Sequence, residues 1–302
     1  MKSQARQVPS GTRISDLRFG NVDHTLPFIP EAVTHLPYTN VYSELSTEHR
    51  LRYNQLFGLY VNELAILFEE GFAPFYQHLA DARLVEATSA PAVRQFVCEE
   101  AEHAAMFRRL NQAAAPELYQ RSPFYFLRPP GPRLSRVLVL LGKCFAPAMV
   151  LLCTIQEERV TRYGDLYRRD EIEPNFFAAT EAHCNEECDH IVLGPLLIER
   201  LWSKSSRVGR ALNGYVFRFL MREFFLAPKR GGVRILNRLV EEFPELRPLS
   251  GRLRGELLEL QRNKRFLRAL YSRDVIPQSI ALLEKNNVLR SAALALPELA
   301  SS

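Results

Sequence analysis

Two short motifs in this sequence place a histidine three residues after a glutamate. The first is Glu100 with His103 in EAEH, and the second is Glu187 with His190 in ECDH. On a helix this spacing puts both side chains on one face, one turn apart, where a single metal ion can contact both. One such pair arises by chance in many helices. Two pairs on strongly apolar helices indicate a metal site much more specifically.

A further glutamate precedes each motif at almost the same distance. Glu69 lies 31 residues before Glu100, and Glu157 lies 30 residues before Glu187. In an antiparallel helix pair with a short connection, equal spacings bring such residues to the same level, so the chain contains one helical hairpin twice. One glutamate from each of two helices and a Glu-x-x-His motif from each of the other two form the di-iron or di-manganese pattern of ferritin-like bundles.

His183 is a further candidate ligand, because it lies one helical turn before Glu187 and on the same stripe as His190. The chain has seven histidines and none after His190, so its last third cannot supply a histidine ligand. The expected metal ligands are therefore Glu69, Glu100, His103, Glu157, His183, Glu187 and His190.

The chemistry of this ligand set favours iron. Four carboxylates balance two ferrous ions, which avoids an uncompensated buried charge. Oxygen and nitrogen ligands suit iron, with manganese as the alternative, better than a structural zinc ion. Cys184 and Cys188 lie beside ligands but are interpreted as small core residues. The alternative interpretation of these candidate ligands is a set of exposed polar residues on amphipathic helices. However, so many acidic residues on one helix need either contact with solvent, or partners such as a metal ion and histidines.

Two positions have competing carboxylates. Glu63 and Glu70 compete with Glu69, and the spacing favours Glu69, which leaves Glu63 as a carboxylate near the ligands or in the pocket. Glu157 and Glu158 are adjacent on a helix and about 100° apart, so only one can face the metals. Glu157 is favoured because it preserves the repeat.

The hydrophobic pattern predicts an all-α fold, a ferritin-like four-helix bundle with additional C-terminal helices. Residues 1–45 are expected to form an extended arm, and residues 46–302 the di-iron domain with its C-terminal helices packed on the bundle. Four long helices are expected at 46 to about 70, ending at Gly71 and Pro74, and at 89–115, 134–167 and 174–202, with a kink at Gly194-Pro195. Further amphipathic stretches lie near 205–226, 231–242, 250–270 and 276–286.

Composition places the chain among intracellular globular proteins. It has 302 residues, of which 47% are apolar and 24% charged. The five cysteines fall in helical stretches and are interpreted as reduced thiols, and no apolar segment follows the basic N-terminus, so we expect a cytoplasmic protein. The apolar run 137–155 contains Lys143 and Pro147 and is interpreted as a core helix, not a membrane span.

The net charge of +5 is modest. The arginine-rich stretch 252–268 also contains glutamates, so we interpret it as a solvated face, with a docking surface for an acidic carrier protein as the alternative. Nucleic-acid binding is not expected, since the basic residues lack interleaved aromatic side chains.

Four segments of the sequence resemble the para-aminobenzoate N-oxygenase family of di-iron enzymes. They are YVNELAILFEE around Glu69, EEAEHAAMF around Glu100 and His103, EERVTRY after Glu157, and IEP followed by HCNEECDH. In that family the second glutamate of Asn-Glu-x5-Glu is the ligand, which matches Glu69. Glu157 and His183 likewise match the family's motif and its extra histidine.

The resemblance implies a ferritin-like homodimer that inserts oxygen from O2 into an arylamine nitrogen in secondary metabolism, with an external electron donor. Hydroxylation or desaturation of carbon in an acyl or carrier-bound substrate would use the same ligands. Iron storage is an alternative of another class, but a simple storage protein would need neither His183 nor the long C-terminal region.

Overall fold

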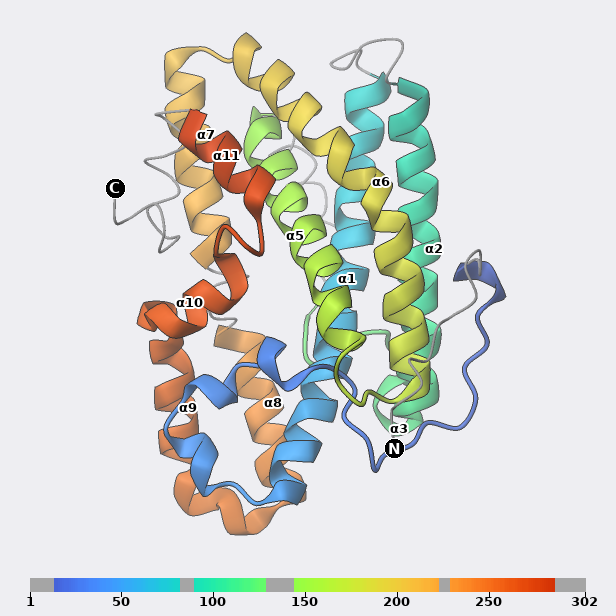
Figure 1. Cartoon of the computed structure of the whole chain (residues 1–302), viewed down its shortest axis with the longest axis vertical. Helices are drawn as coiled ribbons and strands as arrows, with labels where there is room; N and C mark the ends of the chain where they lie inside the picture. The colour runs from blue at the N-terminus through green and yellow to red at the C-terminus, as the bar shows by residue number, and fades with distance from the viewer. Residues whose placement is uncertain (1–13, 82–89, 129–143, 223–228, 286–302) are drawn as a thin grey trace.

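The computed structural model describes residues 14–81, 90–128, 144–222 and 229–285, and within these ranges it contains helices and no strand. Two helical hairpins form the body of the molecule (Figure 1). Helix α1 (Thr47–Asp81) packs along α2 (Ala90–Ala114), and α5 (Ala146–Tyr167) packs along α6 (Pro174–Lys204). Contacts between α2 and α6 join the hairpins. The predicted all-α bundle of two repeated hairpins is confirmed.

Helix α1 is longer than the sequence predicts. The expected end at Gly71 and Pro74 is wrong, because the helix continues through both residues to Asp81. A proline inside a helix removes one hydrogen bond and disfavours the helix. Here the last turns bury Phe75, Tyr76 and further apolar side chains, and this burial outweighs the local cost of the proline.

Apart from the start of α5, the ends of the other bundle helices lie close to their expected positions. Pro174 occupies the first turn of α6, where its missing N–H costs nothing, and the Glu173 carboxylate accepts hydrogen bonds from the backbone N–H groups of Asn175 and Phe176. The chain stays helical past Pro195, and α6 changes direction along its length in Figure 1, as a proline kink would produce. The third helix is wrong as predicted over 134–167, because α5 begins at Ala146 after a non-helical Phe145. Pro147 lies in the first turn of α5, a position that favours a helix start. The start predicted near residue 134 lies outside the described residues.

Gly194 sets how closely α5 and α6 approach. A Cβ atom built at Gly194 would overlap the Thr154 side chain, so a larger residue fits only if Thr154 or one of the helices shifts. Thr154 precedes Glu157 by one turn of α5, and Gly194 follows Glu187 by two turns of α6. The contact therefore helps to fix the distance between two helices that carry candidate ligands.

Residues 14–45 run along one end of the bundle and contain four short 3-10 turns, Ile14–Asp16, Glu31–Val33, Leu36–Tyr38 and Val41–Glu44. Their apolar side chains belong to the core, with Phe28 and Leu36 fully buried. The Asn54 side chain of α1 accepts hydrogen bonds from the Phe28 and Ile29 N–H groups and donates one to the Ile29 carbonyl. These bonds fasten the segment to α1.

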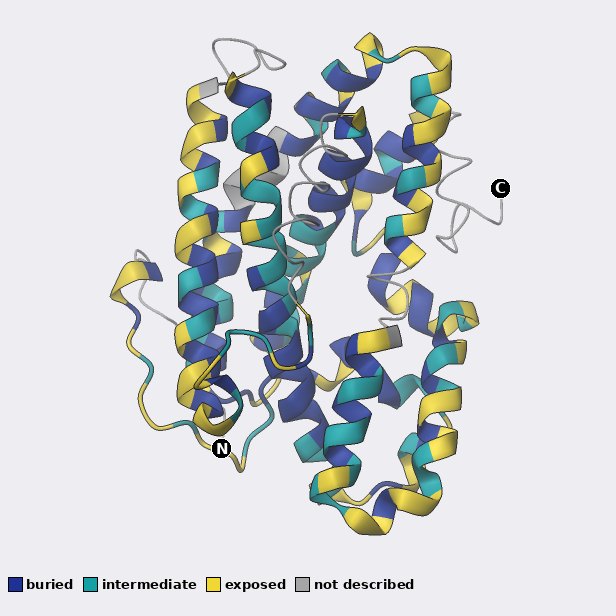
Figure 2. Ribbon diagram, turned by 180° about the vertical axis from the view of Figure 1, so that it is seen from behind, coloured by how far each residue is buried: buried dark blue, intermediate teal, exposed yellow. Residues whose placement is uncertain are grey.

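The C-terminal region adds a layer of shorter helices beside the bundle (Figure 1). Figure 2 shows that helices throughout the molecule turn buried faces inward and exposed faces outward. The predicted stretch 250–270 is in fact two helices, because the Asn263 side chain caps a new helix by accepting from the Arg265 and Phe266 N–H groups. One short helix, α3 (Pro116–Tyr119), follows α2. The helices and 3-10 turns of the C-terminal region are α7 (Arg207–Leu220), α8 (Lys229–Glu242), Pro244–Leu249, α9 (Ser250–Glu259), Leu260–Arg262, α10 (Lys264–Tyr271) and α11 (Pro277–Lys285). Within the described ranges, no helix has the length and apolar character needed to span a membrane.

Candidate metal centre

Four candidate ligands from three helices meet inside the bundle. Glu69 of α1, His103 of α2, and His183 and Glu187 of α6 each offer one donor atom, and these atoms all lie within 4.8 Å of one another. Both histidines and Glu187 are buried, and Glu69 is partly buried. The internal repeat therefore brings its two halves to one point.

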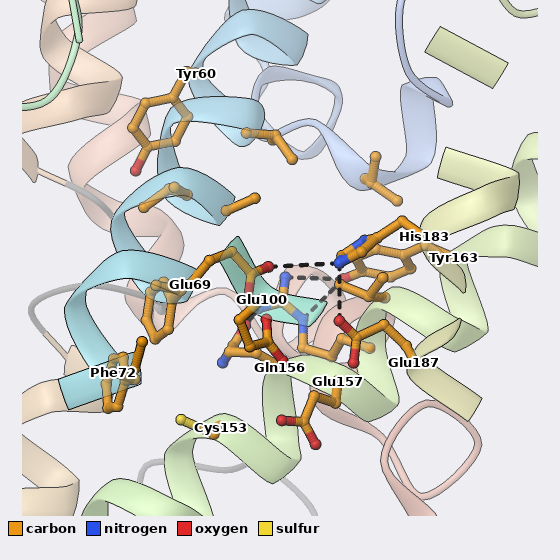
Figure 3. A pocket seen from close by; sticks show the side chains of 18 of the residues that line it. Tyr60, Glu69, Phe72, Glu100, Cys153, Gln156, Glu157, Tyr163, His183 and Glu187 are labelled. Atoms are coloured by element: carbon orange, nitrogen blue, oxygen red, sulfur yellow. Dashed lines mark hydrogen bonds and ion pairs between the residues drawn. The ribbon is translucent and has the colours of Figure 1, made fainter. Parts of the chain in front are cut away.

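Glu187 contacts two imidazole rings, and Figure 3 shows its contact with the ring of His183. Its Oε1 atom is 2.8 Å from the His183 Nε2 atom and 3.5 Å from the His103 Nδ1 atom. The Glu69 Oε1 atom lies 3.5 Å from the same His183 nitrogen. These are the contacts expected where several ligands point toward a shared cation.

Glu100 and Glu157 complete the set of carboxylates. The Glu100 Oε2 atom lies 3.5 Å from the His103 Nδ1 atom, and both glutamates line the same cavity as Glu69, His183 and Glu187. Figure 3 shows the carboxylate of Glu157, on α5, below that of Glu187. Glu100 and Glu157 thus line the cavity beside the four clustered residues, and their role as metal ligands stays a prediction.

His190 lies on α6, but its side chain is outside the described part of the chain. The same holds for Cys188. Their expected roles stay predictions. Cys184 is buried and its thiol donates to the Val160 carbonyl oxygen at 3.3 Å, which agrees with the interpretation as a core residue.

A carboxylate outside the predicted ligand set orients His103. The His103 Nε2 atom lies 3.0 Å from the Glu186 Oε2 atom, which leaves Nδ1 to face Glu100 and Glu187. Metal-binding histidines commonly donate their second N–H to such a carboxylate, which fixes the ring and the tautomer. The sequence signal for Glu186 is the repeat of two glutamates at the start of each motif, EEAEH and EECDH.

The electrostatics of the site favour cations. Burial opposes protonation of His103, but the carboxylates of Glu100, Glu186 and Glu187 outweigh it and raise the pKa of this histidine to about 9. The hydrogen bond to His103 in turn lowers the pKa of Glu186. The negative charge of these carboxylates therefore favours a positive charge at His103, either a proton or a nearby metal ion.

The competing carboxylates serve other parts of the fold. Glu158 accepts hydrogen bonds from the Gln278 and Ser279 N–H groups at the N-terminus of α11, at 2.7 and 2.8 Å. Glu70 pairs with Arg108 at the surface. Neither lines the cavity.

Glu63 does not lie in the pocket, and that part of the sequence interpretation is wrong. Its carboxylate is fully buried and accepts hydrogen bonds from the Tyr119 hydroxyl and from the backbone N–H groups of residues 125–127, at 2.6–3.0 Å. The carboxylate thus fastens the segment after α3 to α1. Burial raises the pKa of Glu63, and these four donors oppose that effect.

A cavity of about 180 Å³ opens from the ligands between α1 and α5. Most of its wall is apolar and aromatic, with Phe57, Phe68, Phe72, Tyr76 and Phe96 among the lining side chains. Val33 and His35 of the segment before α1 also line it, a contribution that sequence reasoning did not connect with the site. Cys153, also on the wall, has its pKa raised by burial and stays a neutral thiol.

The donor set fits iron. The four clustered donors are oxygen and nitrogen atoms with no thiolate among them, a combination that suits iron better than structural zinc. The His183 Nε2 atom is buried and makes no hydrogen bond, although a Glu187 oxygen lies 2.8 Å away. An imidazole nitrogen left without a hydrogen bond at a cluster of carboxylates is free to bind a metal ion.

Comparison with known proteins agrees with this chemistry. Residues 18–240 match the family model described as P-aminobenzoate N-oxygenase AurF. The match covers well over half of the chain and contains both helical hairpins and every candidate ligand. No curated protein and no solved structure matches the chain. With its repeated hairpin and clustered ligands, the chain belongs to the P-aminobenzoate N-oxygenase AurF family, the family that its motifs resemble.

Proposed function

We propose that this protein is a di-iron oxygenase that uses O2 to oxygenate the nitrogen of an arylamine. The observation that carries the proposal is the convergence of Glu69, His103, His183 and Glu187 within 4.8 Å, beside an apolar cavity. Membership in an N-oxygenase family supports the type of reaction. Iron bound there would supply the electrons and the Lewis acidity that O2 activation needs.

The protein's own groups would hold the ions and keep the charge balanced. Glu69, Glu100, Glu157 and Glu187 would bind as carboxylates, and the four negative charges match two ferrous ions. His103 and His183 would bind as neutral imidazoles. Glu186 would keep the remaining proton of His103 on Nε2, since it lies 3.0 Å from that atom.

The cavity walls would hold a flat ring and exclude water. The Phe68 and Phe72 rings are stacked, with centroids 5.0 Å apart and an interplanar angle of 9°, and Tyr76 packs against Phe96 with centroids 4.6 Å apart. Such walls suit an aromatic ring, which buries apolar area on both faces. The family description names p-aminobenzoate, and an arylamine of this kind is the substrate that we propose.

The rival functions fit the cavity less well. Oxidation of carbon in an acyl or carrier-bound substrate would use the same ligands, but it predicts a narrow channel lined by aliphatic side chains in place of aromatic ones. An iron store needs a polar route for hydrated ions, whereas this cavity is mainly apolar. An acidic carrier protein would be a partner only for the oxidation of a carrier-bound acyl substrate. Arg252 and Arg262 of the basic stretch, which could contact such a carrier, already pair with Glu44 and Glu259.

We also propose that the enzyme is a homodimer and that it works in the cytoplasm with an external electron donor. Support for self-association comes from an exposed apolar row on α7, formed by Val208, Leu212, Tyr215 and Phe219. Support for a reducing compartment comes from the free thiols of the described cysteines. Light scattering in solution tests the dimer, and a monomer at micromolar concentration would contradict it.

Iron analysis combined with turnover tests the proposed reaction. The protein is reconstituted with ferrous iron without O2, its metal content is measured, and it is then exposed to O2 with a panel of arylamines and fatty acids. We expect two iron ions per chain and N-oxygenated products from arylamines only. One ion per chain, tight zinc without oxidisable iron, or products oxidised on carbon would contradict the proposal.

A further inference from the structure

The outer face of α10 is a basic patch, formed by the exposed side chains of Lys264, Arg265 and Arg268. Residues 260–273 contain five basic residues and no acidic one. Two of the five, Arg262 and Arg273, pair with glutamates outside this stretch. The three residues of the basic patch form no ion pair with a carboxylate of the described residues, so their charges are available to a partner.

Two of these cations lie where a helix disfavours them. Lys264 and Arg265 are the first two residues of α10, and the Asn263 side chain caps the helix directly before them. The helix dipole places partial positive charge at this end, so cations in the first turn lower the stability of the helix. Helix stability therefore does not explain the basic patch, and its charge fits a partner with an acidic surface.

Packed rings connect the basic patch with the cavity at the metal centre. The Arg265 guanidinium lies over the Tyr38 ring, 5.7 Å from its centroid. The Tyr38 ring packs against Phe266 of α10 with centroids 5.4 Å apart, and Phe266 packs edge-on against His35 at 5.1 Å. His35 lines the cavity that the candidate ligands also line. These contacts form a continuous chain from the surface to the cavity wall.

Hydrogen bonds form a second connection from α10. The Tyr271 hydroxyl, at the end of the helix, accepts from the Arg159 guanidinium at 2.9 Å. Arg159 also donates to the Tyr163 hydroxyl at 3.0 and 3.1 Å. Arg159 and Tyr163 line the cavity, and Figure 3 shows Tyr163 in the same pocket as His183 and Glu187. Electron transfer through a protein is faster along bonded and packed groups than across empty space, and α10 offers two such connections.

We propose that the basic patch on α10 is the docking site of an acidic electron-transfer protein that reduces the iron at the metal centre. Each docking event would deliver one electron: the donor's cofactor is oxidised and one ferric ion is reduced to ferrous iron. Two events reduce the pair, and no covalent bond changes. Such interfaces are small and depend on charge, so a patch on one helix is sufficient to steer the encounter. This docking site rests on the proposed di-iron function and names the class of its external donor.

The packing of His35 distinguishes an electron donor from a carrier protein that brings a substrate. The Phe57 and Phe266 rings lie against His35 with centroids 4.6 and 5.1 Å away, and both contacts are edge-on. A tethered substrate cannot pass a wall of packed rings, whereas an electron can. The connection from α10 therefore suits a redox partner.

Rapid mixing of the ferric protein with a reduced plant-type ferredoxin, an acidic protein with a [2Fe–2S] cluster, tests the docking site without any amine substrate. The visible absorbance of the ferredoxin reports the electron transfer. Lys264→Glu combined with Arg265→Glu reverses two charges of the basic patch and should fold, because acidic residues favour the first turn of a helix. Lys204→Glu combined with Arg207→Glu is the matched control. Both of its side chains are exposed, at the end of α6 and the start of α7, and the net charge changes by the same amount.

At low ionic strength, the second-order rate of reduction should fall at least about 10-fold in the α10 variant and less than about 2-fold in the control. Added salt should slow the wild type and bring its rate toward that of the α10 variant, because screening removes the attraction. Calorimetry with oxidised ferredoxin and protein that has not been loaded with iron should show a similar loss of affinity without any reaction. Reduced methyl viologen, a small donor that needs no docking site, should reduce all three iron-loaded proteins equally fast.

The small donor separates failure of the docking site from failure of the proposed function. Equal ferredoxin rates in the wild type and the α10 variant, with reduction by methyl viologen intact, would overturn the docking site and leave the oxygenase standing. The docking site would also be overturned if the α10 variant lost only its binding to an acidic acyl carrier protein or to phosphatidylglycerol vesicles. A wild-type protein whose bound iron methyl viologen cannot reduce would instead contradict the proposed oxygenase.

Discussion

Glu157 and Glu158 are neighbours in sequence, but their substitution should affect different properties, iron binding for Glu157 and stability for Glu158. Glu157 lines the cavity beside the other candidate ligands, whereas Glu158 accepts hydrogen bonds from the first turn of α11. Glu157→Ala should therefore lose iron and keep its stability in the metal-free state. Glu158→Ala should keep its iron-binding residues and lose stability.

The stability loss for Glu158→Ala follows from its two hydrogen bonds. Glu158 is 5% exposed, and it accepts from the Gln278 and Ser279 N–H groups at 2.7 and 2.8 Å. Loss of a side-chain cap at a helix N-terminus costs about 0.5–2 kcal/mol, and a charged acceptor adds about 0.3–1 kcal/mol through the helix dipole. Because Ser279 is fully buried, water replaces these bonds poorly, so we expect a loss of about 2–3 kcal/mol.

Thermal unfolding of the metal-free proteins measures this loss, and elemental analysis after iron loading measures the site. At about 2–4 °C per kcal/mol for a domain of this general size, Glu158→Ala should melt about 5–10 °C lower than the wild type. Glu157→Ala should melt within about 2 °C of the wild type and bind at most one iron ion tightly. Iron loss in Glu158→Ala with an unchanged melting temperature would refute the assignment of the two carboxylates.

Three further substitutions test the contacts around the site. Gly194→Ala should destabilise the protein by about 1–3 kcal/mol through overpacking against Thr154, and the added change Thr154→Ala should restore part of the loss, as a double-mutant unfolding cycle would reveal. Glu186→Gln should reduce iron affinity about 10- to 100-fold, because it weakens the contact that orients His103. The melting temperature of the metal-free form should not fall. Unchanged affinity in a metal titration would contradict this role. Glu63→Gln should lower the free energy of unfolding by about 2–4 kcal/mol, because an amide cannot accept from all four donors. The refolded variant should still bind two metal ions per chain. An unchanged stability in urea unfolding would show that those hydrogen bonds contribute little.

The spacing in the sequence was sufficient to predict the bundle and to bring four of the candidate ligands together. Nearly equal spacings from Glu69 to Glu100 and from Glu157 to Glu187 indicate two similar hairpins, because a helix advances by a fixed rise per residue. Helix starts marked by a local signal, such as Pro174, were also predictable, because the signal lies within a few residues of the helix start.

The parts that sequence reasoning missed depend on contacts between distant segments. The extension of α1 past Pro74 is decided by burial against other helices, which no local rule includes. The contribution of His35 to the cavity and of Tyr271 to Arg159 requires the two ends of the chain to fold over the bundle. No periodicity encodes where such segments dock.

The buried glutamates show what distinguishes a structural carboxylate from a metal ligand in this fold. Glu63 and Glu158 are as deeply buried as the candidate ligands, but backbone N–H groups surround them, and the hydrogen bonds compensate each charge. Glu187 and Glu69 instead face imidazole nitrogens and other carboxylates, where only cations can balance the charge. Sequence spacing separates these two groups only where an internal repeat exists. The donors around each carboxylate separate them in any helical bundle, because a charge already satisfied by the backbone has little left to offer a metal ion.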